Sequence, residues 1–151
     1  MASKTKKTVL FSILGILLIA TVIGYKLYNK KHFSVENATP VAEITATELH
    51  RSFSSDSTLS NTKFIGDEVN QKVIQVTGAV SEIKKDQQGS TIILLKTGTD
   101  GAYINCTLEL KPNSIEIGKS TTIKGMCTGY NYDAEMDIPG DVIVTRCLIV
   151  K

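Results

Sequence analysis

The sequence predicts a mainly β domain, a five-stranded closed barrel preceded by one or two short helices and by an N-terminal transmembrane helix. Two observations lead to this prediction. A run of 18 residues without a charged side chain stands near the start of the chain, at residues 8–25. From residue 72 onward, apolar side chains recur at every second position, in five segments that turn-forming residues separate. We therefore divide the 151 residues between one membrane segment and one small domain.

The uncharged run TVLFSILGILLIATVIGY, residues 8–25, predicts a membrane anchor. As an α-helix it would extend over about 27 Å, close to the roughly 30 Å hydrocarbon core of a bilayer. Three lysines precede the run and three follow it, and Tyr25 and Tyr28 stand where interfacial aromatic residues are common. The expected divisions of the chain are a basic tail (1–7), the anchor (8–28), a linker (29–43) and the barrel domain (44–151).

A cleaved signal peptide is the main alternative to an anchor. The positive start and the apolar middle fit it, but residues 23–31, IGYKLYNKK, contain no small-x-small cleavage site. We therefore expect a retained single-pass anchor, with the lipid bilayer as a partner. The equal lysine counts nearly balance the two orientations, and the very short basic tail favours an N-terminus inside and a C-terminal domain outside.

The formal net charge of +2 conceals an uneven distribution. Residues 1–31 carry six lysines and no acidic residue, so this part has a charge of +6. Residues 32–151 carry 11 basic and 15 acidic side chains, a net charge of −4. Nucleic-acid-binding domains usually present a basic surface, so the acidic balance disfavours nucleic acid as a partner.

Two short helices are expected before the barrel. Thr45-Ala-Thr-Glu48 matches a capping box, with Thr45 as the N-cap. Leu49 and Phe53 follow at i,i+4 spacing and give this helix an apolar side over about three turns. A second helical segment is expected over residues 57–64, and Gly66 then ends it.

Alternation of apolar and polar side chains predicts the five strands. The clearest is at residues 102–110, where one side consists of Ala102, Ile104, Cys106, Leu108 and Leu110. The other strands are expected at 72–83, 90–96, 120–130 and 141–151, with a connector at 111–118 and a polar, acidic loop at 130–141. Three strands, a connector and two further strands form the order of the OB fold, whereas a β-sandwich usually has more strands.

Several segments carry a resemblance to a known family: YKLYNKKHFSV, ATELHRSF, VIQVTGAVSEI, INCTLEL, TTIKGMCTGY and DVIVTRCLIVK. Together they cover most of the chain. They resemble small bacterial membrane-anchored proteins with the OB-fold domain called tRNA_anti-like. The resemblance implies an OB barrel preceded by helices, and it implies no particular activity. For a bacterial protein the expected location is the inner membrane, as a single-pass protein with its C-terminal domain on the periplasmic side.

A ligand-binding face on an OB barrel combines exposed aromatic side chains with basic ones when the ligand is a single strand of nucleic acid. The candidates for such a face are Tyr103, Lys124, Tyr130 and Tyr132. The neighbouring loop carries four carboxylates that would repel phosphate: Asp133, Glu135, Asp137 and Asp141. The same four are a weaker candidate for a cation site, because their spacing lacks the glycine and the final glutamate of an EF-hand.

The three cysteines are expected on strands. Cys106 and Cys127 fall in the inward phase, and Cys147 shares its phase with Ile143 and Ile149. Buried core positions suit all three. In an exported domain Cys147 could instead form a disulfide with Cys106 or Cys127, and the sequence leaves this choice open. Separated cysteines without C-x-x-C spacing predict no metal site, and no cofactor is expected.

Catalysis has little support in the sequence. None of the motifs G-x-S-x-G, H-E-x-x-H or the P-loop occurs, and His32 and His50 stand apart from any obvious nucleophile. We therefore predict a membrane-tethered binding module, not an enzyme, with a protein, peptide or glycan as its ligand. Binding of single-stranded nucleic acid is the first alternative, and an enzyme is a weaker one.

Overall fold

The computed structural model describes residues 15, 18–25, 33–67, 69–110, 112, 114–133 and 138–150. The chain divides into two compact units, Met1–Phe33 and Ser34–Lys151. In the first unit, residues 18–25 are helical. Among the described residues, no helix combines the length and the apolar character needed to cross a membrane. Most of the predicted anchor, 8–28, lies outside the described residues, so the anchor stays a prediction.

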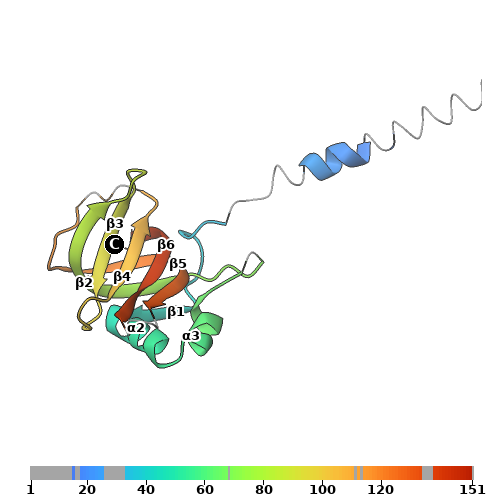
Figure 1. Cartoon of the computed structure of the whole chain (residues 1–151). Helices are drawn as coiled ribbons and strands as arrows, with labels where there is room; N and C mark the ends of the chain where they lie inside the picture. Colours follow the sequence, from blue (N-terminus) through green and yellow to red (C-terminus); the bar gives the residue numbers. More distant parts are fainter. Residues whose placement is uncertain are drawn as a thin grey trace, which may run out of the picture. The chain divides into compact units, whose positions relative to one another are not determined.

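The second unit contains a five-stranded closed barrel, which confirms the barrel part of the predicted fold class (Figure 1). Its strands are β2 (Ile74–Lys85), β3 (Thr91–Lys96), β4 (Tyr103–Leu108), β5 (Ser120–Asp133) and β6 (Ile138–Val150). They pair in the order β2-β3-β4-β6-β5, and β5 also pairs with β2, which closes the barrel. The β4–β6 pair is parallel and the other four pairs of the barrel are antiparallel.

A short strand that was not predicted precedes the helices. This strand, β1 (Ala42–Thr45), pairs in parallel with residues 74–77 of β2. The chain before it is packed on the barrel as well: Val35 is 1% exposed, and Lys124 Nζ donates a hydrogen bond to the Glu36 carbonyl oxygen at 2.8 Å. The domain therefore begins near residue 34, inside the segment predicted as a linker, 29–43.

Both predicted helices are present, and they lie at one end of the barrel (Figure 1). Helix α2 (Ala46–Ser55) begins at the predicted capping box, in which Thr45 Oγ1 and Glu48 Oε2 each accept the other residue's backbone N–H at 3.2 Å. Helix α3 (Ser57–Phe64) begins at Asp56, whose Oδ1 accepts the Leu59 N–H at 2.9 Å. Asp56 also ends α2, so the two helices meet at a one-residue corner.

The barrel interior and the apolar side of the helices share one core. Phe53 and Phe64 bring α2 and α3 together, with ring centroids 6.0 Å apart. Gly78 on β2 lets α2 approach closely, because a Cβ atom there would lie 2.8 Å from the Cβ of Ala46. Other large, fully buried side chains of this core include Leu49, Ile74, Ile93, Leu95, Ile104 and Ile123.

Strand β6 departs from the predicted alternation at Arg146. The φ angle of this residue is +52°, in the left-handed region, and the β4–β6 register shifts by one residue between Cys106/Val144 and Leu108/Cys147. The extra residue turns Cys147 into the core, at 0% exposure, so its predicted shared phase with Ile143 was wrong, whereas Ile149 packs against the same core and does share the phase of Cys147. Leu110 was also misplaced, because β4 ends at Leu108 and leaves Leu110 70% exposed.

Strands β5 and β6 continue beyond the barrel as a two-stranded extension, which we call the β5–β6 hairpin (128–133 and 138–141). Asn131 pairs with Asp141, and Asp133 pairs with Ile138. The β2 strand pairs with β5 only up to Gly125, so the hairpin lies past the closed part of the barrel. The segment predicted as a loop, 130–141, is therefore largely strand, and residues 134–137 lie outside the described part.

Candidate ligand-binding cleft

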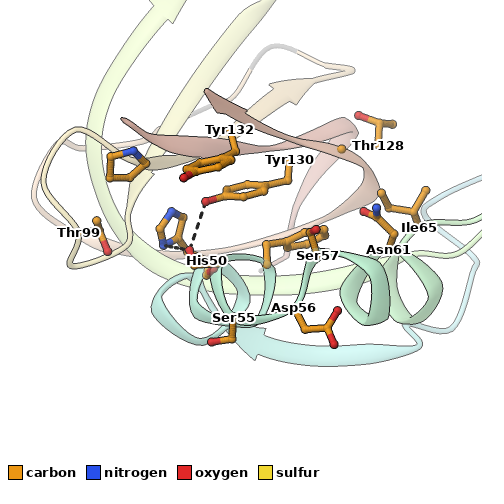
Figure 2. Close-up of a pocket in the computed structure, with 14 residues that line it drawn as sticks. His50, Ser55, Asp56, Ser57, Asn61, Ile65, Thr99, Thr128, Tyr130 and Tyr132 are labelled. Carbon is orange, nitrogen blue, oxygen red and sulfur yellow. Dashed lines mark hydrogen bonds between the residues drawn. The ribbon is translucent and has the colours of Figure 1, made fainter. Parts of the chain in front are cut away.

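A cleft of about 980 Å³ lies between the α2–α3 corner and the β5–β6 hairpin (Figure 2). The helices contribute His50, Phe53, Ser54, Ser57 and Asn61 to its wall. The opposite wall comes mainly from the hairpin, with Thr128, Gly129, Tyr130, Tyr132 and Pro139. The volume is at the upper end of the range of about 300–1,000 Å³ that is usual for ligand sites.

An aromatic row of Phe53, Tyr130 and Tyr132 runs from the core to the surface of this cleft. The ring centroids of Phe53 and Tyr130 are 5.6 Å apart, and those of Tyr130 and Tyr132 are 6.0 Å apart with ring planes only 5° from parallel. Phe53 is 1% exposed, whereas Tyr132 is 46% exposed. The row therefore ends in the accessible ring of Tyr132, and the parallel ring of Tyr130 lies further inside the cleft.

The local structure explains why these rings meet. Tyr130 and Tyr132 are two residues apart on β5, so both side chains project from the same face of the strand. His50 and Phe53 are three residues apart on α2 and share one side of the helix. Because that side of α2 packs against the hairpin, His50 meets the Tyr130 ring edge-on, at 5.9 Å between centroids and 75° between planes.

A chain of hydrogen bonds fixes the inner end of the cleft. His50 Nε2 lies 3.1 Å from the Gly140 carbonyl oxygen, and because a carbonyl only accepts, this nitrogen is the donor. Ser54 Oγ donates to the His50 carbonyl oxygen at 3.0 Å and lies 3.3 Å from the Tyr130 hydroxyl. Since the serine has one proton to donate, the Tyr130 hydroxyl donates to Ser54 Oγ. His50 is only 3% exposed, so its end of the network is shielded from water, whereas Ser54 at the other end is exposed.

The electrostatic character of the cleft is close to neutral. None of the described residues that line it is a lysine or an arginine, and Asp56 is the one carboxylate among them. One oxygen of that carboxylate is already used in the cap of α3. A ligand with several phosphates would find no cationic side chain in this described lining.

The structure separates the predicted ligand-face residues. Tyr130 and Tyr132 both line the cleft. Tyr103 begins β4, where its backbone N–H donates to Asp141 Oδ1 at 2.8 Å, and it does not belong to the described cleft lining. Lys124 lies on β5 about 20 Å from Tyr130, at roughly 3.3 Å for each of the intervening residues. The four residues therefore do not form one surface.

The predicted cation site is described only in part. Glu135, Asp137 and the Asp133 side chain lie outside the described residues. Asp141 is on β6, and its carboxylate accepts the Tyr103 N–H. No cluster of three or more histidine, cysteine or acidic side chains suited to a metal ion occurs within the described ranges.

The three cysteines are buried in the barrel as free thiols. Burial raises the pKa of the Cys127 thiol to about 12. The pKa of the Cys147 thiol is also raised, first by its hydrogen bond with Cys106 and then by burial. Protonated, buried thiols are poor nucleophiles at neutral pH. The disulfide of Cys147 with Cys106 or Cys127 stays a prediction.

Sequence patterns did not indicate the helical side of the cleft. Ser54 lies 76 residues before its partner Tyr130, and His50 lies 90 residues before Gly140. One signal was available: His50 is a polar residue beside Leu49 on the apolar side of a capped amphipathic helix. A buried polar side chain there needs a hydrogen-bond partner from elsewhere in the fold.

Several solved structures are similar to the chain. One is a lipoprotein of Klebsiella pneumoniae subsp. pneumoniae MGH 78578 named for a suggested nucleic-acid-binding activity; it shares 16% identity at a TM-score of 0.47, over 72% of this chain and 91% of that one. Another is the asparaginyl-tRNA synthetase of Entamoeba histolytica in complex with asparaginyl-adenylate, with 18% identity, a TM-score of 0.38 and coverage of 74% of this chain. The yeast Stn1 and Ten1 structure shares 16% identity at a TM-score of 0.38, over 76% of this chain and 65% of that one.

These likenesses decide nothing about the ligand, because every TM-score is below 0.5. The chain covers only 24% of the synthetase chain. No curated protein matches the chain. The family comparison is stronger, because the tRNA_anti-like model matches residues 1–137, most of the sequence. The chain, with its OB-fold barrel, therefore belongs to the tRNA_anti-like family.

Proposed function

We propose that the chain is a membrane-tethered OB-fold binding module that engages a protein, peptide or glycan in the cleft, and that it is not an enzyme. One observation carries this proposal: the cleft joins an accessible aromatic ring to a wall of neutral polar side chains, without a lysine or arginine among its described lining. Pockets that combine aromatic surface with a few fixed polar groups are typical binding sites.

The character of residues 18–25 supports the tether. These residues are helical, and their large apolar side chains are exposed: Leu18, Ile19, Val22, Ile23 and Tyr25. Thr21 Oγ1 donates to the Leu18 carbonyl oxygen at 3.1 Å, so the hydroxyl is satisfied within the helix, as lipid requires. Together with the flanking lysines, this favours a single-pass anchor in a bacterial inner membrane with the barrel on the periplasmic side.

Binding of single-stranded nucleic acid is the second candidate. The accessible ring of Tyr132 suits base stacking, which is sequence-tolerant and common in OB folds. The net charge of −4 over residues 32–151 and the neutral cleft argue against it. We therefore consider single-stranded nucleic acid a less favoured ligand than a neutral one.

A titration of the full-length chain, held in phospholipid nanodiscs, separates the two candidates. Fluorescence anisotropy with labelled single-stranded RNA and DNA at low salt should show no binding tighter than about 100 μM. Uncharged peptides and neutral oligosaccharides, tested by their effect on Tm, should include a ligand whose effect is lost in Tyr132→Ala. Micromolar nucleic-acid binding that weakens as salt rises would reverse the order of the candidates.

A separate experiment tests on which side of the membrane the barrel lies. A cysteine introduced by Ser34→Cys, at an exposed position, should react with a membrane-impermeant maleimide in intact cells. The unaltered chain is the control, because its cysteines are buried. Labelling that requires cell lysis contradicts the periplasmic orientation. A shortened chain in the soluble fraction, with an intact mass below the 16.4 kDa of the full chain by the mass of the anchor, would show that the anchor is removed.

A further inference from the structure

We infer that the cleft binds a neutral oligosaccharide, with one sugar ring stacked on Tyr132. This inference rests on the proposed function, because it takes the cleft as the ligand site and names the class of ligand. Three features carry it: a supported aromatic face, unused neutral hydrogen-bonding groups and the absence of cationic side chains from the described lining.

The aromatic face is held in place before any ligand arrives. Tyr132 is 46% exposed and lies parallel to Tyr130. Tyr130 in turn packs on Phe53 and donates to Ser54. A ring held in this way loses little conformational entropy on binding. The flat C–H face of a pyranose matches such a ring in size and polarity.

The polar wall matches the hydroxyl groups of a sugar. Ser57 and Asn61 line the cleft on the α3 side, and Figure 2 shows Asn61 beside Ile65 at the same end as Thr128. The side chains of Ser57 and Asn61 form no hydrogen bond with any described residue. Hydroxyl and amide groups both donate and accept, as sugar hydroxyls do, whereas phosphate oxygens accept and favour cations.

A peptide fits this geometry less well. A peptide that adds to a sheet needs an open strand edge, whose backbone groups it can bind. Strand β5 has such an edge beyond Gly125, where β2 no longer pairs with it, but the cleft is lined by a strand face, because Tyr130 and Tyr132 project into it from the same side of β5. The cleft volume of about 980 Å³ has room for more than one sugar ring. We therefore favour a short oligosaccharide.

Isothermal titration calorimetry of the full-length chain in phospholipid nanodiscs tests the inference, since many mild detergents carry sugar headgroups. The probes are three linear tetrasaccharides: β-1,4-linked glucose, α-1,4-linked glucose and β-1,4-linked N-acetylglucosamine. At least one should bind with a Kd of about 1 mM or tighter. Tyr132→Ala should weaken that binding about tenfold, whereas Tyr132→Phe, which keeps the ring, should change it less than about threefold.

A control variant and two further probes, an uncharged peptide and single-stranded RNA, distinguish the possible outcomes. Tyr103→Ala removes a tyrosine outside the cleft lining and should leave the sugar affinity unchanged. Failure of all three tetrasaccharides, or sugar binding that Tyr132→Ala does not weaken, overturns the inference. If an uncharged peptide then binds in a Tyr132-dependent way, the proposed function stands and only the ligand class is wrong. Salt-sensitive binding of single-stranded RNA would instead contradict both the inferred ligand class and the proposed function.

Discussion

The imidazole Nε2 of His50 on α2 lies 3.1 Å from the carbonyl oxygen of Gly140 on β6 and joins the helix to the hairpin across 90 residues of sequence. Both residues are buried. The contact holds the two walls of the cleft together at its inner end. It also fixes the edge-on position of the imidazole against Tyr130.

Replacing His50 by leucine should therefore destabilise the domain and disturb the cleft. His50→Leu leaves the Gly140 carbonyl without its donor, and an unsatisfied buried polar group costs about 1–3 kcal/mol. Urea unfolding should show a loss of this size. His50→Gln offers an amide donor and should recover part of it. Equal stabilities for the leucine and glutamine variants would mean that the hydrogen bond contributes nothing.

Of two glycines of β5, one should be sensitive and the other insensitive to replacement by alanine. A Cβ at Gly125 would lie 2.7 Å from Cys147 Sγ and 2.8 Å from Val144 Cγ1, so Gly125→Ala should lower the free energy of unfolding by about 1–3 kcal/mol. A Cβ at Gly129 would meet nothing within 4 Å, so Gly129→Ala should change it by less than about 0.5 kcal/mol. Thermal unfolding of both variants measures the contrast, and a stable Gly125→Ala would show that the barrel core relaxes around the methyl group.

The buried thiols should make the domain sensitive to alkali. Burial raises the pKa of Cys127 from its ordinary value of 9.0 to about 12 in the fold, so the unfolded chain releases this proton first. The contribution of the protonated Cys127 thiol to the free energy of unfolding is complete below pH 9.0 and is lost as the pH rises toward 12. The slope is about 1.4 kcal/mol per pH unit for one thiol. Urea unfolding under reducing conditions should show a shallower alkaline decline for Cys127→Ala than for the unaltered chain, and parallel declines would contradict this.

The carboxylate half of the capping box, in which Glu48 Oε2 accepts the Thr45 N–H, should contribute most to stability when Glu48 is ionised. Its hydrogen bonds with the Thr45 side chain and backbone lower the pKa of Glu48 below its ordinary value of 4.5. The contribution is therefore complete above pH 4.5 and is lost as the pH falls through the lowered pKa. The Tm difference between the unaltered chain and Glu48→Gln should shrink in acid. A Tm difference that stays constant as the pH falls would contradict this contribution of Glu48.

Local signals predicted the elements they control. The Thr45–Glu48 capping box marked the start of α2, and strict alternation placed Ala102, Ile104 and Cys106 in the core. These features depend on residues within a few positions of one another. The five strands and their order followed from the same local patterns.

The remaining errors come from long-range pairing. Strand β1 is four residues long with a half-buried pattern, and only its parallel partner in β2 makes it a strand. In the acidic 130–141 segment, residues 130–133 and 138–141 are strand because β5 and β6 pair with each other there, which composition does not reveal. The sequence predicted only the Tyr130 and Tyr132 side of the cleft, because the two walls come from α2–α3 and from a hairpin far along the chain.

The left-handed backbone conformation of Arg146 constrains how the sequence and length of β6 can change among related chains. The residue adds one position to β6, and Cys147 faces the core only because of that addition. A deletion of one residue here would exchange the inward and outward positions of everything that follows in the strand. We expect related chains to tolerate changes of residue type at this position, including glycine, which suits the backbone angle, but not a change in strand length.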